Sequence, residues 1–203
     1  MRIIETRPAP NPRRVRIFLA EKGIEIPFEE TDIMGRELRT AEFTAINPMQ
    51  RVPVLVLDDG TAISESVAIC RYFEELHPEP ALFGHGALGR ALVEMWNRRM
   101  EQGLFAAITQ VFRHLNPKMA ALESPQIAPW GEANKPKVQE MLGVLDGVLA
   151  NHHYVAGDDY SIADITALVA IDFMKPARLE WREGHPNIER WHAEVSARPS
   201  AEA

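Results

Sequence analysis

The strongest constraint on the fold of this chain is the stretch NPMQRVPVLVLDDGTAISESVAICRYF at positions 47–73. Its apolar run VLVL, residues 54–57, predicts a short buried strand. Residues 58–60, Asp-Asp-Gly, predict a hairpin turn because Asp and Gly tolerate the positive φ angles of such turns. A second short strand is expected around Ala62-Ile63, and Ser64-Glu65-Ser66 then opens a helix. The apolar positions of that helix recur at helical spacing: Val67, Ile69, Cys70, Phe73 and Leu76.

Two places on this hairpin offer groups to a ligand. Val52-Pro53 stands at the entrance of the first strand, where an X-Pro bond can be held in the cis form. With a cis bond there, the backbone N–H and C=O of Val52 face outward and can pair with an extended, peptide-like ligand. At the other end, Glu65 and Ser66 lie where the N–H groups of a helix are unsatisfied and its dipole favours an anion. A carboxylate beside such donors suits an α-amino-acid head, with its ammonium and its carboxylate.

The combined pattern resembles a known family. N-P-x-x-x-V-P-x-L followed by S-E-S-x-A-I-x-x-Y is similar to the thioredoxin-like half of glutathione transferases, including the interval and the intervening hairpin. The resemblance implies that Val52 and Pro53 pair with the cysteinyl backbone of glutathione, and that Glu65 and Ser66 hold its γ-glutamyl end. The alternative reading is a hairpin, a helix cap and a structural proline that bind no ligand.

The order of elements before this stretch predicts the fold class of the first part of the chain. Residues 2–5 form a strand, a helix runs to Gly23, residues 27–33 form a second strand and residues 40–46 a short helix. Together with the hairpin and its helix, this order is typical of a thioredoxin-like α/β domain. We place that domain at residues 1–77 and a proline-rich linker at 78–86.

Residues 87–203 lack strand signals and predict an all-α helical domain. Residues 88–115 form one long helix or two helices broken near Gly103, residues 124–131 form a mobile loop, and residues 138–149 form a further helix. A capping box at Ser161–Asp164 opens a buried helix, in which Asp164 serves folding. A last helix spans residues 186–197, and the pattern W-x-x-x-x-x-A-R-P-S at residues 191–200 also resembles the family.

Composition excludes several classes of protein. A net charge of −7 argues against a nucleic-acid surface, and no apolar run is long enough to cross a membrane. No positively charged segment followed by an apolar stretch opens the sequence, so we expect no secretion signal, and the single cysteine, Cys70, fits a small buried core residue in a reducing cytosol. We therefore expect a cytoplasmic protein. No paired histidines or cysteines stand at metal-ligand spacing, so we expect no metal.

Glutathione chemistry needs a thiolate, and the loop before the first helix is where the family stabilises it. Serine-type members carry S-P-x-x-x-R-V there, whereas this chain has Ala9-Pro10-Asn11-Pro12-Arg13-Arg14-Val15, with Ala9 in place of the serine. The segment resembles the T-P-N loop of nu-type bacterial members without its threonine. Asn11 is therefore the best side-chain donor to the sulfur, although it also fits as the N-cap of the helix, with Pro12 at the first helical position. Thr6 is a weaker candidate.

Two more substrate contacts follow from the resemblance. Arg51 stands where the family often has Lys or Arg for the glycine carboxylate of glutathione, and Arg39 reads better as a surface arginine. We expect His114 to be a surface or dimer-contact histidine. An apolar hollow for the second substrate is expected between the domains, although periodicity marks most of its candidates as core residues: Met34, Leu104, Phe105, Ile108, Phe112, His114 and Trp130.

The resemblance implies a cytoplasmic glutathione transferase, a detoxification enzyme that activates the glutathione thiol for conjugation to small apolar electrophiles or for peroxide reduction. It also implies a homodimer built across the helices of residues 65–76 and 88–112. Two alternatives follow from the departures in the first loop. One is a non-catalytic glutathione-binding or protein-interaction module, and the other is a glutathione-dependent disulfide reductase.

Overall fold

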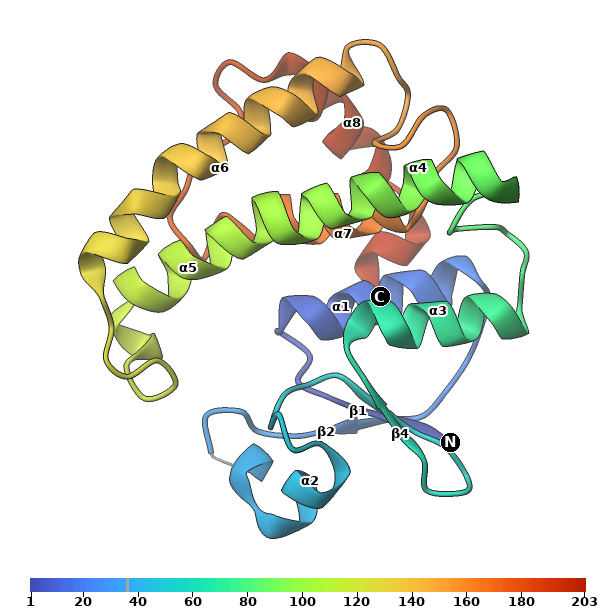
Figure 1. The fold of residues 1–203 in the computed structure, drawn as a ribbon, viewed down its shortest axis with the longest axis vertical. Coiled ribbons are helices and arrows are strands. Elements are labelled where there is room, and N and C mark those ends of the chain that lie inside the picture. The colour runs from blue at the N-terminus through green and yellow to red at the C-terminus, as the bar shows by residue number, and fades with distance from the viewer. Residues whose placement is uncertain (36) are drawn as a thin grey trace. The chain divides into compact units, whose positions relative to one another are not determined.

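The computed structural model describes residues 1–35 and 37–203, which divide into two compact units (Figure 1). The first unit comprises Met1–Pro80 with Glu202–Ala203, and the second comprises Ala81–Ala201. A small mixed sheet with helices builds the first unit, and helices build the second. The predicted fold class, thioredoxin-like α/β followed by all-α, is confirmed. The division into independent domains at 1–77 and 87–203, with a linker at 78–86, stays a prediction.

The sheet of the first unit has four strands in the order β2-β1-β3-β4. Strand β1 pairs in parallel with β2 and antiparallel with β3, and β3 pairs antiparallel with β4 as the sequence predicts for the hairpin. The bounds are β1 Arg2–Glu5, β2 Phe28–Glu30, β3 Val54–Val56 and β4 Ala62–Ser64. Strand β2 is shorter than the predicted 27–33, because it lies at the sheet edge with all its residues exposed and gains little from burial.

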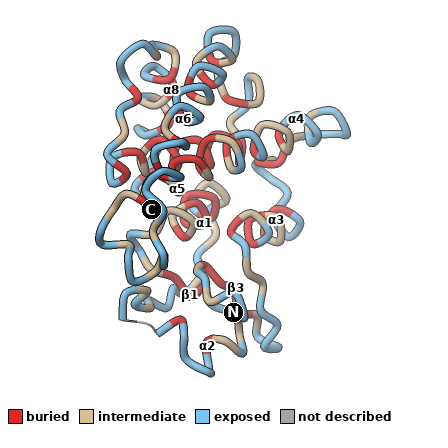
Figure 2. The backbone as a smooth tube through the Cα atoms, turned by 60° about the vertical axis from the view of Figure 1, so that its left-hand side comes forward, coloured by how far each residue is buried: buried red, intermediate tan, exposed pale blue. Residues whose placement is uncertain are grey.

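Three helices flank this sheet: α1 (Pro10–Glu21), α2 (Ala41–Ile46) and α3 (Ser66–Leu76). Figure 1 shows α1 and α3 on one side of the sheet and α2 on the other. Successive side chains along β1 and β3 point to opposite faces of the sheet, so both faces carry buried apolar residues. Ile4, Val54 and Val56 pack in a cluster with Leu38 and Phe43, whereas Ile3 and Leu55 are buried on the opposite face. In Figure 2, most residues of β1 and β3 have the colour of buried residues. Each such side chain contributes about 1.5–3 kcal/mol through burial.

The second unit is built from α4 (Gly86–Arg98), a π-helical segment (Arg99–Phe105), α5 (Ala106–Leu115), α6 (Ala128–Leu149), α7 (Ile162–Phe173) and α8 (Pro186–Ser196). The run from α4 to α5 is continuous, so the helix does not break at Gly103 but passes through the π-helical segment. A Cβ on Gly103 would lie 3.0 Å from the Met141 side chain, which explains why a small residue stands there. Every helix in the described part of the chain is too short or too polar to cross a membrane.

Helix α6 corrects a prediction. Residues 124–131 were expected to form a mobile loop, but α6 already begins at Ala128 and contains Pro136 in its interior. Pro129 stands in the first turn of the helix, where its missing N–H has no intrahelical partner to lose. Of the two prolines that favoured a loop, Pro125 lies before α6 and Pro129 is accommodated in its first turn.

Asp164 is fully buried at the start of α7, in the capping box that the sequence predicts. Its Oδ1 accepts hydrogen bonds from the N–H of Val155 and from Nε1 of Trp191, both at 2.9 Å. Its Oδ2 accepts from the N–H of Ser161 at 3.0 Å and from the Ser161 hydroxyl at 3.1 Å. Burial raises the pKa of the Asp164 carboxyl to about 6, and these hydrogen bonds act in the opposite direction. One carboxylate thus ties α7 to α8 and to the loop before α7.

Replacing Asp164 with Ala should lower the free energy of unfolding by about 3 kcal/mol, because four buried donors lose their acceptor. Urea denaturation at pH 7 measures this loss. Asp158→Ala is the matched control, since Asp158 is an exposed acid in the preceding loop. Equal denaturation midpoints for the two variants would contradict the folding role of Asp164.

Candidate functional site

The first turn of α1 differs from the sequence prediction. Ala9 is the N-cap, with φ −77° and ψ 139°, and Pro10 is the first helical residue. The prediction that Asn11 caps the helix with Pro12 in the first helical position is therefore wrong. Both prolines fit inside the first turn, because the N–H groups of that turn have no partner within the helix. The Asn11 side chain is not used as a cap.

This geometry decides which donors the loop offers. Pro10 and Pro12 have no N–H, the N–H of Ala9 donates to Thr6 O at 2.9 Å, and the N–H of Arg13 donates to Ala9 O at 3.2 Å. Across residues 9–13, the N–H of Asn11 is the one backbone donor without a hydrogen bond to a described residue. The Thr6 hydroxyl donates to Thr31 O at 2.5 Å, which weakens its candidacy further.

The side chain of Asn11 meets a buried arginine. Arg14 Nη1 donates to Asn11 Oδ1 at 3.1 Å and also to Ser66 Oγ at 2.6 Å. A guanidinium group only donates, so both oxygens act as acceptors here, and the Asn11 Nδ2 and the Ser66 O–H remain as donors. Arg14 thus links the residue that the sequence analysis assigned to the glutathione sulfur with one that it assigned to the γ-glutamyl end.

Sequence reasoning assigned no role to Arg14 and missed this contact. A signal was present: Arg14 precedes Phe18 by one helical turn and so shares the apolar face of α1. Both side chains are fully buried. An arginine on the buried face of a helix indicates a specific polar partner, since an unpaired buried cation is costly.

Glu65 lies immediately before α3 in a strained backbone conformation. Its φ is +70° and its ψ is 114°, which is uncommon for any residue other than glycine. Its carboxylate is exposed and makes no capping hydrogen bond, whereas Ser66 behind it is buried. Strained backbone of this kind often marks a functional site. Glu65 therefore holds an exposed anion beside the first N–H groups of an eleven-residue helix.

The Val52–Pro53 peptide bond is cis, as the sequence predicts. Val52 directly precedes β3, and no hydrogen bond joins its backbone N–H or C=O to a described residue. The turn before it is held by Asn47, whose Nδ2 donates to the carbonyl of Arg51 at 2.8 Å. Arg51 itself is exposed. The backbone N–H and C=O of Val52 can therefore form β-type hydrogen bonds with an extended ligand.

Several other candidates have structural roles. Leu104, Phe105 and Ile108 are buried in the core of the second unit. His114 is buried and its Nδ1 accepts a hydrogen bond from the N–H of Ile127 at 3.0 Å, so the expectation of a surface or dimer-contact histidine is wrong. Cys70 is fully buried, as expected. Within residues 1–35 and 37–203 we find no cluster of three His, Cys, Asp or Glu side chains that could hold a metal ion.

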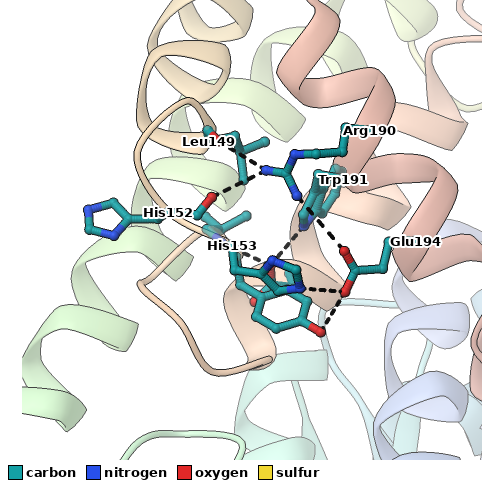
Figure 3. Close-up of polar contacts among 9 residues, drawn as sticks. Leu149, His152, His153, Arg190, Trp191 and Glu194 are labelled. Carbon is teal, nitrogen blue, oxygen red and sulfur yellow. Dashed lines mark hydrogen bonds and ion pairs between the residues drawn. The ribbon is translucent and has the colours of Figure 1, made fainter.

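A separate cavity of about 340 Å³ lies beside the end of α6 and is lined in part by His153, Arg190 and Glu194. Figure 3 shows that its polar groups are engaged with one another. Arg190 Nη2 donates to the carbonyls of Leu149 and His152, and the Tyr154 hydroxyl donates to Glu194 Oε1 at 2.8 Å. Burial and this hydrogen bond raise the pKa of Tyr154. The cluster therefore fastens α8 to the end of α6.

Comparisons with known proteins identify the family. The model of the glutathione S-transferase N-terminal domain matches residues 9–76, and that of the C-terminal domain matches residues 105–199. Glutathione S-transferase 2 of Saccharomyces cerevisiae is 35% identical over 98% of this chain and 87% of its own length.

Two crystal structures agree with this match. A glutathione S-transferase domain-containing protein of Marinobacter aquaeolei is 40% identical, with a TM-score of 0.95 over 98% of this chain and 99% of its own. A class Gtt2 glutathione S-transferase of Vibrio parahaemolyticus is 38% identical, with a TM-score of 0.88 over 100% of this chain and 96% of its own. The chain belongs to the glutathione S-transferase family. Conjugation of glutathione is the activity that this membership supports.

If Glu65 holds the γ-glutamyl ammonium, as the resemblance implies, replacing Glu65 with Ala should weaken glutathione binding by about 1–3 kcal/mol, roughly 5- to 150-fold in Kd. Titration calorimetry measures the change. Glu65→Gly should weaken glutathione binding by the same amount as Glu65→Ala. Its free energy of unfolding should nevertheless be about 1 kcal/mol higher than that of Glu65→Ala, because glycine adopts the positive φ at this position without strain. Unchanged affinity in both variants would remove Glu65 from the site.

Proposed function

We propose that this chain is a glutathione transferase in which Asn11 stabilises the glutathione thiolate in place of the missing serine hydroxyl. The observation that carries the proposal is the pair of donors on Asn11. Its backbone N–H and its Nδ2 have no described hydrogen-bond acceptor, and they stand at the positive end of α1. Among residues 9–13, Asn11 has the one backbone N–H without a hydrogen bond to a described residue.

Glutathione binds, in this proposal, along the first unit. Its cysteinyl backbone pairs with the N–H and C=O of Val52, with Pro53 shaping the strand entrance. Its γ-glutamyl ammonium meets the Glu65 carboxylate, while its γ-glutamyl carboxylate accepts from the Ser66 hydroxyl and the first N–H groups of α3. Its glycine carboxylate meets Arg51. Two observations support these roles: the backbone N–H and C=O of Val52 form no hydrogen bond to a described residue, and the carboxylate of Glu65 is exposed.

The chemistry follows from the position of the thiol. A free thiol has a pKa near 8.5, so its anion must be favoured for attack at neutral pH. Donors that hold the sulfur before and during attack lower that pKa and keep the thiolate oriented. The thiol proton leaves to water. The thiolate then bonds to the carbon of a small apolar electrophile and displaces a leaving group such as halide, or it attacks a peroxide oxygen, breaking the O–O bond to give an alcohol and a sulfenic acid. A second glutathione thiol condenses with that sulfenic acid to give glutathione disulfide and water. No metal takes part in this scheme.

Asn11→Ala should raise the pKa of the bound glutathione thiol by about one to two units, because a hydrogen bond to a charged acceptor is worth roughly 1.5–3 kcal/mol. Thiolate absorbance against pH measures the shift, and turnover at pH 7 should fall while glutathione binding is mostly retained. Superimposable absorbance curves for the parent and Asn11→Ala would withdraw the role of Asn11.

Ala9→Ser is the matched gain-of-function variant. A serine at the N-cap of α1 returns a hydroxyl to the loop and should raise turnover with a halo-nitroaromatic substrate. The two alternative functions are outcomes of the same assays. Glutathione binding without any turnover would indicate a binding module, and disulfide exchange without conjugation would indicate a disulfide reductase.

We further propose that the protein is a cytoplasmic homodimer whose interface includes α4. Leu88 and Leu92 lie one turn apart on this helix, with exposed fractions of 73% and 38%. Figure 2 shows that most of α4 is exposed or intermediate. Arg98 of α4 forms ion pairs with Glu94 of the same helix and with Glu101 of the π-helical segment that follows. These charges are paired within one chain, so the proposed interface rests on the exposed apolar residues instead.

Leu88→Glu should shift the protein from dimer to monomer at micromolar concentration, because a charge would be buried without a partner. Light scattering measures the mass. Val144→Glu is the control, since Val144 is also exposed but lies on α6. A monomeric parent protein, or a dimer that both substitutions leave intact, would contradict this interface.

A further inference from the structure

We propose that Arg14 is a positioning residue that holds the Asn11 amide and the Ser66 hydroxyl in their donor orientations. The inference rests on the proposed function, because it concerns how those two residues meet glutathione. The observation behind it is one guanidinium nitrogen, Nη1, that donates to both side chains.

Burial makes the presence of Arg14 informative. Its side chain is fully buried on the apolar face of α1, next to Val15 and in line with Phe18. An apolar side chain would satisfy the packing of this face at lower desolvation cost. A cation at this position therefore serves its polar partners.

The first partner is the side-chain amide of Asn11. An isolated Asn can turn its amide about χ2 over a broad range, so either its oxygen or its nitrogen can face a given direction. A guanidinium group has no acceptor, so at 3.1 Å from Nη1 it selects Oδ1. The Nδ2 group is then directed away from Arg14 as a donor. The arginine thereby decides which end of the amide is presented to the sulfur.

The second partner is the hydroxyl of Ser66, which is proposed to bind the γ-glutamyl end of the ligand. Ser66 Oγ accepts from Nη1 at 2.6 Å, so its own proton is free to be donated to an anion. A donor bonded to a cation is also polarised, which strengthens the hydrogen bond that it gives. Loss of Arg14 should therefore change two quantities together, the thiol pKa and the affinity for glutathione.

The chain contains a matched control two residues away. Arg16 is also buried on α1, but its Nη1 pairs with Glu5 of β1 and its Nη2 donates to the carbonyl of Arg7. Arg16 thus fastens the helix to the sheet without touching Asn11 or Ser66. If both buried arginines had purely structural roles, substituting either one should have the same effects on stability and on glutathione binding.

The test compares Arg14→Lys with Arg16→Lys. Lysine keeps the charge but cannot place one nitrogen of a rigid fork between two acceptors. We expect Arg14→Lys to raise the pKa of the bound glutathione thiol by about one unit and to weaken glutathione binding by about tenfold. Arg16→Lys should lower the melting temperature and leave both quantities unchanged. If Arg14→Lys does not fold, Arg14→Gln takes its place, with a shift expected in the same direction.

A double variant separates this inference from the proposed function. In an Asn11→Ala background, Arg14→Lys should raise the thiol pKa no further, because the amide through which it acts is gone. Additive shifts would overturn the positioning role, as would an unchanged pKa in Arg14→Lys alongside a raised pKa in Asn11→Ala. An unchanged pKa in Asn11→Ala alone would instead overturn the thiolate role proposed for Asn11.

Discussion

The hydrogen bonds from one buried guanidinium group join the two helices that frame the candidate site. Arg14 of α1 contacts Ser66 at the start of α3 and Asn11 in its own first turn. The two helix N-termini are thereby held in a defined relation, and both present donors where an anion is expected. The proposed binding of a thiolate at one terminus and of a carboxylate at the other depends on this single contact.

The proline pair in the first turn of α1 sets the second constraint. Because Pro10 and Pro12 lack N–H groups, and because the N–H groups of Ala9 and Arg13 donate within the loop, Asn11 has the one backbone N–H of residues 9–13 without a hydrogen bond to a described residue. A serine in place of Ala9 would add a hydroxyl donor. The chain thus combines the fold of a glutathione S-transferase with a proposed thiolate site in which the Asn11 amide replaces the serine hydroxyl.

Features that depend on local sequence could be predicted. The hairpin of β3 and β4, the capping box of Ser161 and Asp164, and the cis bond at Val52–Pro53 each follow from residues within a few positions of one another. The helix start at Glu65-Ser66 belongs to the same group, although its positive φ could not be read from a glutamate. These local features were enough to predict the fold class, and they include the residues on which the candidate site is built.

Features that depend on distant partners could not be predicted. The contact between Arg14 and Ser66 spans 52 residues, and the Asn11 amide takes its orientation from Arg14 after folding. The early start of α6 and the burial of His114 likewise depend on packing between helices. Sequence patterns predict which face of a helix is apolar, but not which polar group is buried within it.

The account is tested most directly by a crystal structure of this protein with glutathione bound. It predicts that the sulfur lies within hydrogen-bonding distance of the Asn11 Nδ2 and N–H, with Asn11 Oδ1 still bonded to Arg14. A sulfur held by other groups, with Asn11 out of reach or its amide turned so that Oδ1 faces the sulfur, would contradict the central claim.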